Sequence, residues 1–233
     1  MTVEATHTAV IIVAAGVGHR FGSDIPKQFV SVGGKPLLLL SIERMRAALP
    51  GAIIIVALHP DYFDLWHSIT NRHSDFDATG IILTQGGSTR WHSVALALEA
   101  LPAHITTVMV HDAARPLVSP QVVDRLMQSL TSGAKGVVPA VAVSDSLRAI
   151  EPGYTRALDR SAIRAVQTPQ AFPRAILTEA YALPYTPAFT DDASVVEALH
   201  PGSIEIVEGC VDTLKITHPA DIATLQYILA HEH

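Results

Sequence analysis

The chain has 233 residues, of which 48% are hydrophobic and 16% charged, and its formal net charge is −6. A chain of this length can bury a full core as one large α/β domain, and the acidic balance argues against general nucleic-acid binding, which requires a basic surface. The single cysteine, Cys210, excludes an internal disulfide framework and favours the reducing cytoplasm.

Three further features narrow the class of protein. No apolar run is long enough to cross a bilayer, and the first residues, MTVEATHT, carry neither the basic nor the apolar stretch of a signal peptide. The 12 histidines form no zinc-ligand spacing. Because few residues are charged, apolar surface is left to cover, and we expect an interface between subunits.

The first predicted element is a strand at residues 9–14, a run of alanine and β-branched residues typical of a parallel strand buried on both faces. The loop that follows holds three glycines and two cations: Gly16, Gly18, Gly22, Arg20 and Lys27. Such a loop lets backbone N–H groups approach an anion at the end of a strand. The spacing matches neither a dinucleotide fingerprint nor a P-loop. We therefore expect a polyphosphate site of another kind.

Strands and helices then alternate along the chain. Strands are predicted at residues 52–58, 81–84, 107–110 and 136–143, and helices at 34–49, 61–73, 88–101 (with Ser88 as N-cap) and 120–130. This alternation predicts a Rossmann-like, doubly wound, mostly parallel sheet with right-handed crossovers.

Two of these predicted strands end in polar or glycine-rich motifs. Gly86-Gly87 follows the strand at 81–84, and His111-Asp112-Ala113-Ala114-Arg115-Pro116 follows the strand at 107–110. Open α/β sheets bind ligands at the carboxyl ends of their strands. Both motifs are therefore candidate ligand-binding segments.

Residues 144–166 interrupt the alternation. Two short segments at 147–150 and 155–158, separated by Glu151-Pro152-Gly153, predict a β-hairpin arm that protrudes from the body. Because a protruding hairpin has unpaired edges, we expect the arm to pair with a second subunit. The whole chain, 1–233, is then one domain with a dimerisation arm.

The last part of the chain returns to the earlier pattern. Helices are predicted at 173–183 and 219–231, a helix start at Thr190–Ser194, and strands at 204–208 and 212–216.

These motifs, in this order, resemble those of the 2-C-methyl-D-erythritol 4-phosphate cytidylyltransferase family of the non-mevalonate isoprenoid pathway. The resemblance starts with A-A-G-x-G-x-R at Ala14–Arg20 and Pro26-Lys27-Gln28. It continues through Gly86-Gly87 with Arg90 and Ser93, the His111–Pro116 motif, Asp145-Ser146, Asp159-Arg160, Thr168-Pro169-Gln170, Thr190–Ser194 and Val207–Lys215. It implies an enzyme that joins CTP to methylerythritol phosphate and releases pyrophosphate, with Mg²⁺ as cofactor.

The resemblance also implies roles for individual residues. The catalytic residues would be Arg20 and Lys27. The nucleotide would be lined by Ala14, Ala15, Gly16 and Gly18, and cytosine would be recognised by Gly86, Gly87 and Ser93. The ribose and the metal would lie at Asp112 and Ala113. Asp212 would be a second metal contact; Arg115, Ser146, Arg160, Thr168 and Lys215 would hold the acceptor, with Ser146 and Arg160 supplied by the partner subunit.

Other functions stay open at this point. A sister family uses a pentitol phosphate such as ribitol phosphate as acceptor and shares the loop and Gln-Thr-Pro-Gln. Ala114 and the Asp-Asp-Ala-Ser string favour the methylerythritol enzyme, and the glycine pair argues against a sugar-1-phosphate guanylyl- or uridylyltransferase. A non-catalytic nucleotide-binding protein on this fold is the remaining alternative, although retention of Arg20, Lys27 and Lys215 argues against it.

Overall fold

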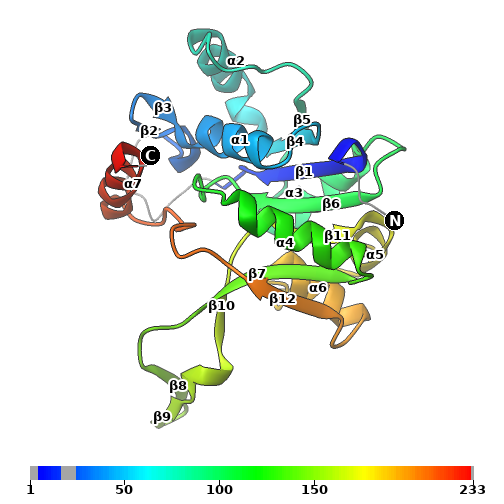
Figure 1. Cartoon of the computed structure of the whole chain (residues 1–233), viewed down its shortest axis with the longest axis vertical. Helices are drawn as coiled ribbons and strands as arrows, with labels where there is room; N and C mark the ends of the chain where they lie inside the picture. The colour runs from blue at the N-terminus through cyan, green and yellow to red at the C-terminus, as the bar shows by residue number, and fades with distance from the viewer. Residues whose placement is uncertain (1–4, 17–24, 232–233) are drawn as a thin grey trace.

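The structure is a computed structural model that describes residues 5–16 and 25–231. Within these residues an eight-stranded sheet forms the centre of the body (Figure 1). Its strands are β1 (Thr8–Val13), β4 (Ile53–Leu58), β5 (Ile82–Gln85), β6 (Thr107–Asp112), β7 (Gly136–Ala142), β10 (Arg164–Val166), β11 (Gln170–Pro173) and β12 (Ile204–Glu208).

Within this sheet the strand pairs are mostly parallel, as predicted. β1 lies between β4 and β6, β4 also pairs with β5, and β7 pairs with β12, all in parallel register. β10 and β11 run antiparallel, β10 beside β7 and β11 beside both β6 and β7. The sequence analysis did not predict these two strands, because they are only three and four residues long. The predicted doubly wound α/β class is confirmed.

Helices cover both faces of the sheet. They are α1 (Leu37–Ala48), α2 (Phe63–Arg72), α3 (Arg90–Glu99), α4 (Pro120–Thr131), α5 (Arg174–Ala180) and α6 (Asp192–Leu199). The last helix, α7 (Ala220–His231), packs instead in a smaller cluster with Val32, Leu37 and Ile216. Short 3-10 turns lie at 5–7, 27–29, 60–62 and 160–162. No helix of the described segments is both long and apolar enough to cross a membrane.

Alternate residues of β1 divide the core between those two faces. Val10 and Ile12 pack in the cluster that contains α1, α2 and α4, whereas Ala9 and Ile11 pack in the cluster that contains α3, α5 and α6. Successive side chains of a strand point to opposite faces, so a fully apolar strand is what two covered faces require.

Three local predictions were wrong. The first helix begins at Leu37 rather than at Gly34, because β2 (Ser31–Val32) and β3 (Lys35–Pro36) form a small antiparallel pair there; its turn uses positive φ at Gly33 and Gly34. Thr89, and not Ser88, caps α3 by accepting from the His92 N–H. Residues 212–216 form no strand.

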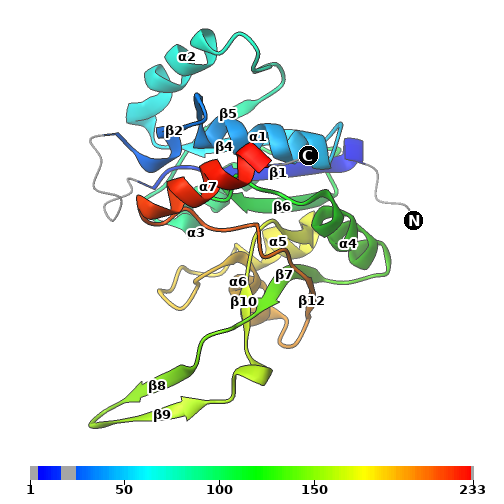
Figure 2. The same cartoon turned by 60° about the vertical axis from the view of Figure 1, so that its left-hand side comes forward.

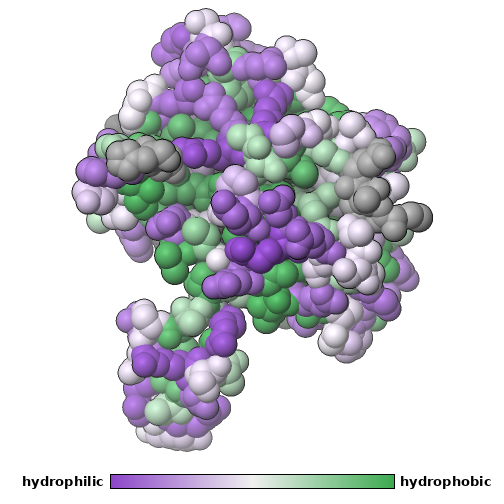
Figure 3. Space-filling view, viewed as in Figure 1, coloured by the Kyte–Doolittle hydropathy of each residue, from purple (hydrophilic) through white to green (hydrophobic). Residues whose placement is uncertain are grey.

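The predicted hairpin arm is present. β8 (Leu147–Glu151) and β9 (Tyr154–Leu158) pair antiparallel around a turn at Gly153 and extend away from the body (Figure 2). The arm forms a separate lobe of mixed polar and apolar surface (Figure 3). Ile150 and Tyr154 are 80% and 61% exposed there, so this hairpin offers apolar side chains that its own chain does not cover.

Candidate functional site

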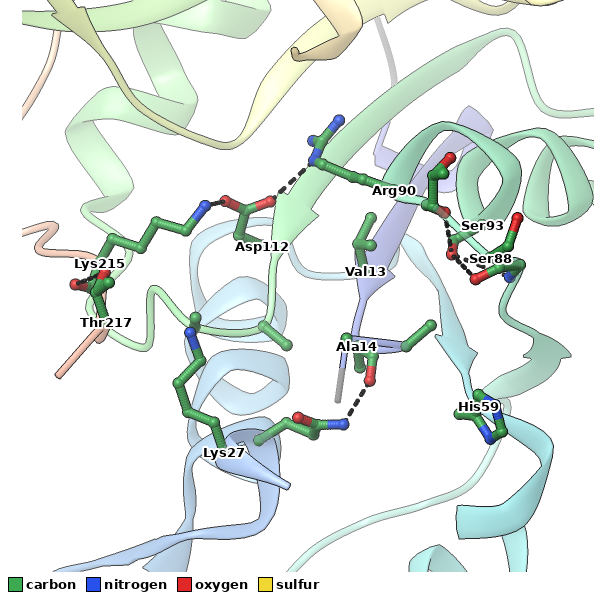
Figure 4. A pocket seen from close by; sticks show the side chains of 17 residues that line it. Val13, Ala14, Lys27, His59, Ser88, Arg90, Ser93, Asp112, Lys215 and Thr217 are labelled. Carbon is green, nitrogen blue, oxygen red and sulfur yellow. Dashed lines mark hydrogen bonds and ion pairs between the residues drawn. The ribbon is translucent and has the colours of Figure 1, made fainter. Parts of the chain in front are cut away.

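A cavity of about 600 Å³ opens at the carboxyl ends of the central strands (Figure 4). Nine of the predicted site residues line it: Ala14, Ala15, Gly16, Lys27, Gly87, Ser93, Asp112, Ala113 and Lys215. They come from the loops after β1 and β5, from the first turn of α3, from the end of β6 and the residue after it, and from the segment before α7. Parallel strands deliver their loops to one edge of the sheet, and this is why residues so distant in sequence meet there.

The described residues of the loop after β1 that line the cavity are those at 14–16, Lys27 and Gln28. The Ala14 N–H donates to the Ala57 carbonyl at 2.9 Å, and the buried Gln28 amide donates to the Ala14 carbonyl at 2.7 Å. The neighbouring Lys27 begins the 3-10 turn at 27–29 and extends its side chain into the cavity (Figure 4). The predicted Gly18 and Arg20 lie outside the described residues.

The glycine pair after β5 lies in close contact with neighbouring segments. A Cβ on Gly86 would meet the Ala15 Cβ at 2.1 Å, and one on Gly87 would meet the His92 Cβ at 2.4 Å. The Gly86 N–H donates to the Leu58 carbonyl at 2.8 Å. Gly87 lines the cavity, while Gly86 is buried behind it. Both positions therefore need glycine because the backbones approach closely.

Ser93 supports this loop from the first turn of α3. Its hydroxyl accepts from the Gly87 N–H at 3.1 Å and donates to the Thr89 carbonyl at 2.9 Å. The side chain is 1% exposed. Its hydrogen bonds thus hold the shape of the loop that faces the cavity.

Asp112 is the acidic residue of the cavity wall, and two cations hold it. Its Oδ2 lies 2.7 Å from the Lys215 ammonium and its Oδ1 lies 3.2 Å from the Arg90 Nε (Figure 4). Burial alone would raise the pKa of Asp112, but Arg90 and Lys215 hold it well below its usual range. The carboxylate is therefore ionised at neutral pH.

Thr168 lies behind Asp112 and does not line the cavity. Its Oγ1 accepts from the Asp112 N–H at 3.1 Å and lies 3.0 Å from the His111 Nδ1. The His111 Nε2 lies 3.0 Å from the Arg115 carbonyl, which can only accept, so Nε2 carries the proton. Burial lowers the pKa of His111 to about 4, so the neutral Nδ1 accepts from the Thr168 hydroxyl. These bonds fix the backbone of Asp112.

Arg115 lies behind the cavity wall. Its Nη1 donates to the Thr213 carbonyl at 2.8 Å, and burial lowers the pKa of its guanidinium. Its Nε is buried and has no hydrogen-bond partner within the described part of the chain. A buried donor of this kind is suited to an anionic ligand.

The remaining predicted residues are not brought to this cavity. Ser146 and Arg160 are exposed in the arm, where Arg160 donates to the Ser144 carbonyl. Asp212 is exposed on a turn and does not line the cavity. Across residues 5–16 and 25–231, no group of three or more histidine, cysteine or acidic side chains could hold a metal ion.

Although the sequence analysis named Gln28 and Arg90 in motifs, it assigned no binding or catalytic role to several residues that line the cavity: Gln28, His59, Ser88, Thr89, Arg90 and Thr217. Arg90 is the most notable, because it bridges Asp112 and the buried Asp192, whose Oδ2 lies 2.6 Å from the Arg90 Nη2. Its position directly after Gly86–Thr89, at the start of a helix, was the available signal.

Comparisons with known proteins agree with this geometry. A family model described as 2-C-methyl-D-erythritol 4-phosphate cytidylyltransferase matches residues 8–231. Curated proteins of that name from Streptomyces coelicolor and Bacteroides thetaiotaomicron are 37% and 40% identical, over 96% and 92% of this chain and 85% and 95% of theirs.

Solved structures are similar over the same range. The crystal structure of 2-C-methyl-D-erythritol 4-phosphate cytidylyltransferase from Thermus thermophilus is 35% identical with a TM-score of 0.74, over 95% of this chain and 98% of that one. The 4-diphosphocytidyl-2C-methyl-D-erythritol synthase from Anaerococcus prevotii is 25% identical with a TM-score of 0.81, over 98% and 100%.

Proposed function

The chain belongs to the 2-C-methyl-D-erythritol 4-phosphate cytidylyltransferase family, and from this we infer that the cavity between the loops after β1, β5 and β6 is its site of nucleotidyl transfer. The enzyme transfers the cytidylyl group of CTP to 2-C-methyl-D-erythritol 4-phosphate in the non-mevalonate isoprenoid pathway. The products are 4-diphosphocytidyl-2-C-methyl-D-erythritol and pyrophosphate.

One observation carries the assignment of the cavity. Lys27, Asp112 and Lys215 come from three distant segments and line the same cavity at the carboxyl edge of the sheet. A polyphosphate needs cations of this kind, and a nucleoside needs the close backbone approach that Gly87 provides.

The chemistry needs positioned charge rather than a general base. A phosphomonoester has its second pKa near ~6, so the acceptor is mostly a dianion at neutral pH. One of its oxygens forms a bond to the α-phosphorus of CTP, and the bond from that phosphorus to the bridging oxygen of pyrophosphate breaks. Lys27, together with Arg20, stabilises the charge that spreads over the transferring group.

Roles for the other residues follow from their places around the cavity. The backbone of Ala14–Gly16, with Gly18, lines the nucleotide; Gly87 contacts cytosine, and Gly86 and Ser93 hold Gly87 in place, which their hydrogen bonds and close contacts support. Asp112 and Ala113 face the ribose.

Mg²⁺ is the proposed cofactor, and the donor set of the cavity fits it. Mg²⁺ at nucleotide sites is held by one or two carboxylates together with substrate phosphates and water. Asp112 is an ionised carboxylate in the cavity wall and would hold the ion with the triphosphate. The ion would neutralise charge on the phosphates. Asp212, predicted as a second contact, is exposed outside the cavity, and we do not include it.

The acceptor half of the site is proposed to lie between Lys215, Arg115 and the arm of a second subunit. Arg115 lies behind the cavity wall with a buried Nε that has no partner in the described segments, and its role in binding the acceptor phosphate is proposed from the family. Ser146 and Arg160 are exposed in an arm that extends from the body. The protein would thus be a homodimer in which each arm completes the partner's site.

CTP as substrate and the single cysteine support a cytoplasmic location.

The test is pyrophosphate release by the purified protein with Mg²⁺. CTP with methylerythritol phosphate should give release, while UTP, ATP or GTP in place of CTP should not. Release with ribitol phosphate in place of methylerythritol phosphate would move the protein to the sister family. No release with any pair would contradict catalysis altogether.

A further inference from the structure

Asp112 is held by two cationic side chains that differ in how far they are exposed to solvent. The Lys215 side chain, which bonds Oδ2, is 46% exposed, whereas the Arg90 side chain, which bonds Oδ1, is 25% exposed. A lysine this exposed can turn towards a phosphate in the cavity. The question is what then keeps the Asp112 carboxylate in place.

Arg90 is fixed from behind by Asp192. The Arg90 Nη2 lies 2.6 Å from the Asp192 Oδ2, and Asp192 is fully buried. The Tyr181 hydroxyl donates to the other Asp192 oxygen at 2.7 Å, and the Asp192 N–H donates to the Gln170 Oε1 at 3.1 Å. Burial and Asp192 together raise the pKa of Tyr181, so its hydroxyl stays a donor. Asp192 is therefore held at both carboxylate oxygens and at its backbone.

The charges of this cluster cancel. Arg90 and Lys215 contribute two positive charges, and Asp112 and Asp192 contribute two negative ones. Two of the three guanidinium nitrogens of Arg90 already contact carboxylates. Arg90 lines the cavity, but its charge is balanced inside the protein and is not offered to a triphosphate.

We propose that Arg90 is a positioning residue for the transfer reaction: anchored by Asp192 and Tyr181, it keeps the Asp112 carboxylate directed at the cavity when Lys215 moves to a substrate phosphate. This inference rests on the proposed function of the cavity. The hydrogen-bonded chain from Tyr181 through Asp192 to Arg90 would then support the transfer reaction from behind the cavity, since Arg90 lines the cavity and the other two residues do not.

A double-mutant cycle tests the proposal. Arg90→Gln, Asp112→Asn and the double variant are compared by kcat/KM with CTP and methylerythritol phosphate. Arg90→Gln alone should lower kcat/KM by about 10- to 100-fold, the range expected for a charged hydrogen bond. In the Asp112→Asn background the same change should cost clearly less than in the wild-type background, because the carboxylate charge that Arg90 holds is gone and only a neutral amide oxygen is left to accept from it. An equal cost in both backgrounds would overturn the proposal, since Arg90 would then act on the substrate directly.

Asp192→Asn gives a second test through the sign of its effect. If Arg90 instead bound CTP directly through its positive charge, removal of the Asp192 charge would leave the Arg90 charge free for CTP and would lower the KM for CTP. Positioning requires the opposite, a fall in kcat with no improvement in the KM for CTP. A lower KM with unchanged kcat would overturn the proposal.

Because Asp192 is fully buried, a milder variant guards against misfolding. Tyr181→Phe removes one hydrogen bond to the Asp192 carboxylate and should lower kcat by about two- to tenfold at unchanged KM for CTP, less than Arg90→Gln because the effect reaches Asp112 only through Arg90. Wild-type rates in both variants, Asp192→Asn and Tyr181→Phe, would overturn the proposal.

The matched control is Arg46→Gln. Arg46 lies on α1 and donates to the Asp77 and Thr79 carbonyls, away from the cavity, and its replacement should leave both constants unchanged. Circular dichroism and Tm confirm that each variant folds. Failure of the wild-type protein to release pyrophosphate would refute the proposed function itself, whereas additive effects in an active protein would refute only the role of Arg90.

Discussion

The cavity and the arm of this molecule are built in opposite ways. Around the cavity, Asp112, Ser93 and Thr168 are buried, and their polar atoms are bonded to other parts of the chain. In the arm, Ile150 and Tyr154 are largely exposed, and within the described residues the Arg160 side chain donates a hydrogen bond to the nearby Ser144 carbonyl. The difference fits the proposed division of the site, in which the sheet preassembles the nucleotide half and the acceptor half would be completed by the arm of a second subunit.

The largest expected effect lies in the preassembled half. Lys27→Ala should lower kcat by about 100- to 1000-fold, because one positioned charge that stabilises the transferring phosphoryl group is lost. The fold should be unaffected, since Lys27 is only half-buried on a short turn. Steady-state rates of pyrophosphate release and circular dichroism measure the two outcomes.

Lys135→Ala is the matched control, because Lys135 is exposed after α4 and away from the cavity. It should keep the wild-type rate. A Lys27→Ala variant within threefold of that rate would break the comparison, since Lys27 would then not be an essential cation of the preassembled half.

The next effect concerns the buried wall behind Asp112. Burial lowers the pKa of His111 from its usual 6.5 to about 4, so between these pH values the unfolded chain binds a proton that the folded chain does not. Stability is therefore present above about pH 6.5 and is lost as the pH falls towards 4. The contribution of His111 is on the order of 3 kcal/mol over this window.

Urea unfolding of the metal-free protein at pH 7 and pH 4.5 measures this loss. His111→Gln should be less stable at pH 7 but should lose less stability on acidification. His67→Asn, a change at an exposed position on α2, should keep the wild-type difference. An unchanged difference in His111→Gln would show that the wall does not depend on a neutral histidine.

A smaller and more selective effect is expected in the arm. Arg160→Ala should raise the KM for methylerythritol phosphate by about 10- to 100-fold, as expected for loss of one charged contact, and should leave the KM for CTP unchanged. Arg156→Ala is the control, because Arg156 lies on the same hairpin and pairs with Glu151 at 3.7 Å. Equal acceptor constants in the two variants would remove the arm from the site.

The sequence predicted the body well because its signals were strong. The apolar run of β1 and the spacing of Val122, Val123, Leu126 and Leu130 on α4 gave elements whose burial the structure confirms. Short antiparallel strands such as β11 have no comparable signal, since three or four residues cannot display a period. The segment at 212–216 read as a strand from its apolar residues, but Ile216 instead donates its N–H to the Ala114 carbonyl as part of a loop.

The sequence predicted the site residues that lie in recognisable motifs, but not the contacts that hold those residues in place. Glycine-rich turns and cations at strand ends can be recognised along the chain, and nine predicted residues line the cavity. The Arg90–Asp192 pair joins residues 102 positions apart, and no local pattern reports such a contact. Similarly, Thr168 was predicted to hold the acceptor, whereas its hydroxyl is committed to Asp112 and His111.

The most direct test of the split between body and arm is complementation in a mixed dimer. Lys27→Ala and Arg160→Ala chains carrying different affinity tags are co-expressed, and dimers containing both are isolated by two successive purifications. One site of each mixed dimer then combines an intact body with an intact partner arm, so activity should return to about half of the wild-type value at limiting acceptor. Activity no higher than that of the two single variants, or failure to recover any mixed dimer, would contradict an acceptor site completed by the partner subunit.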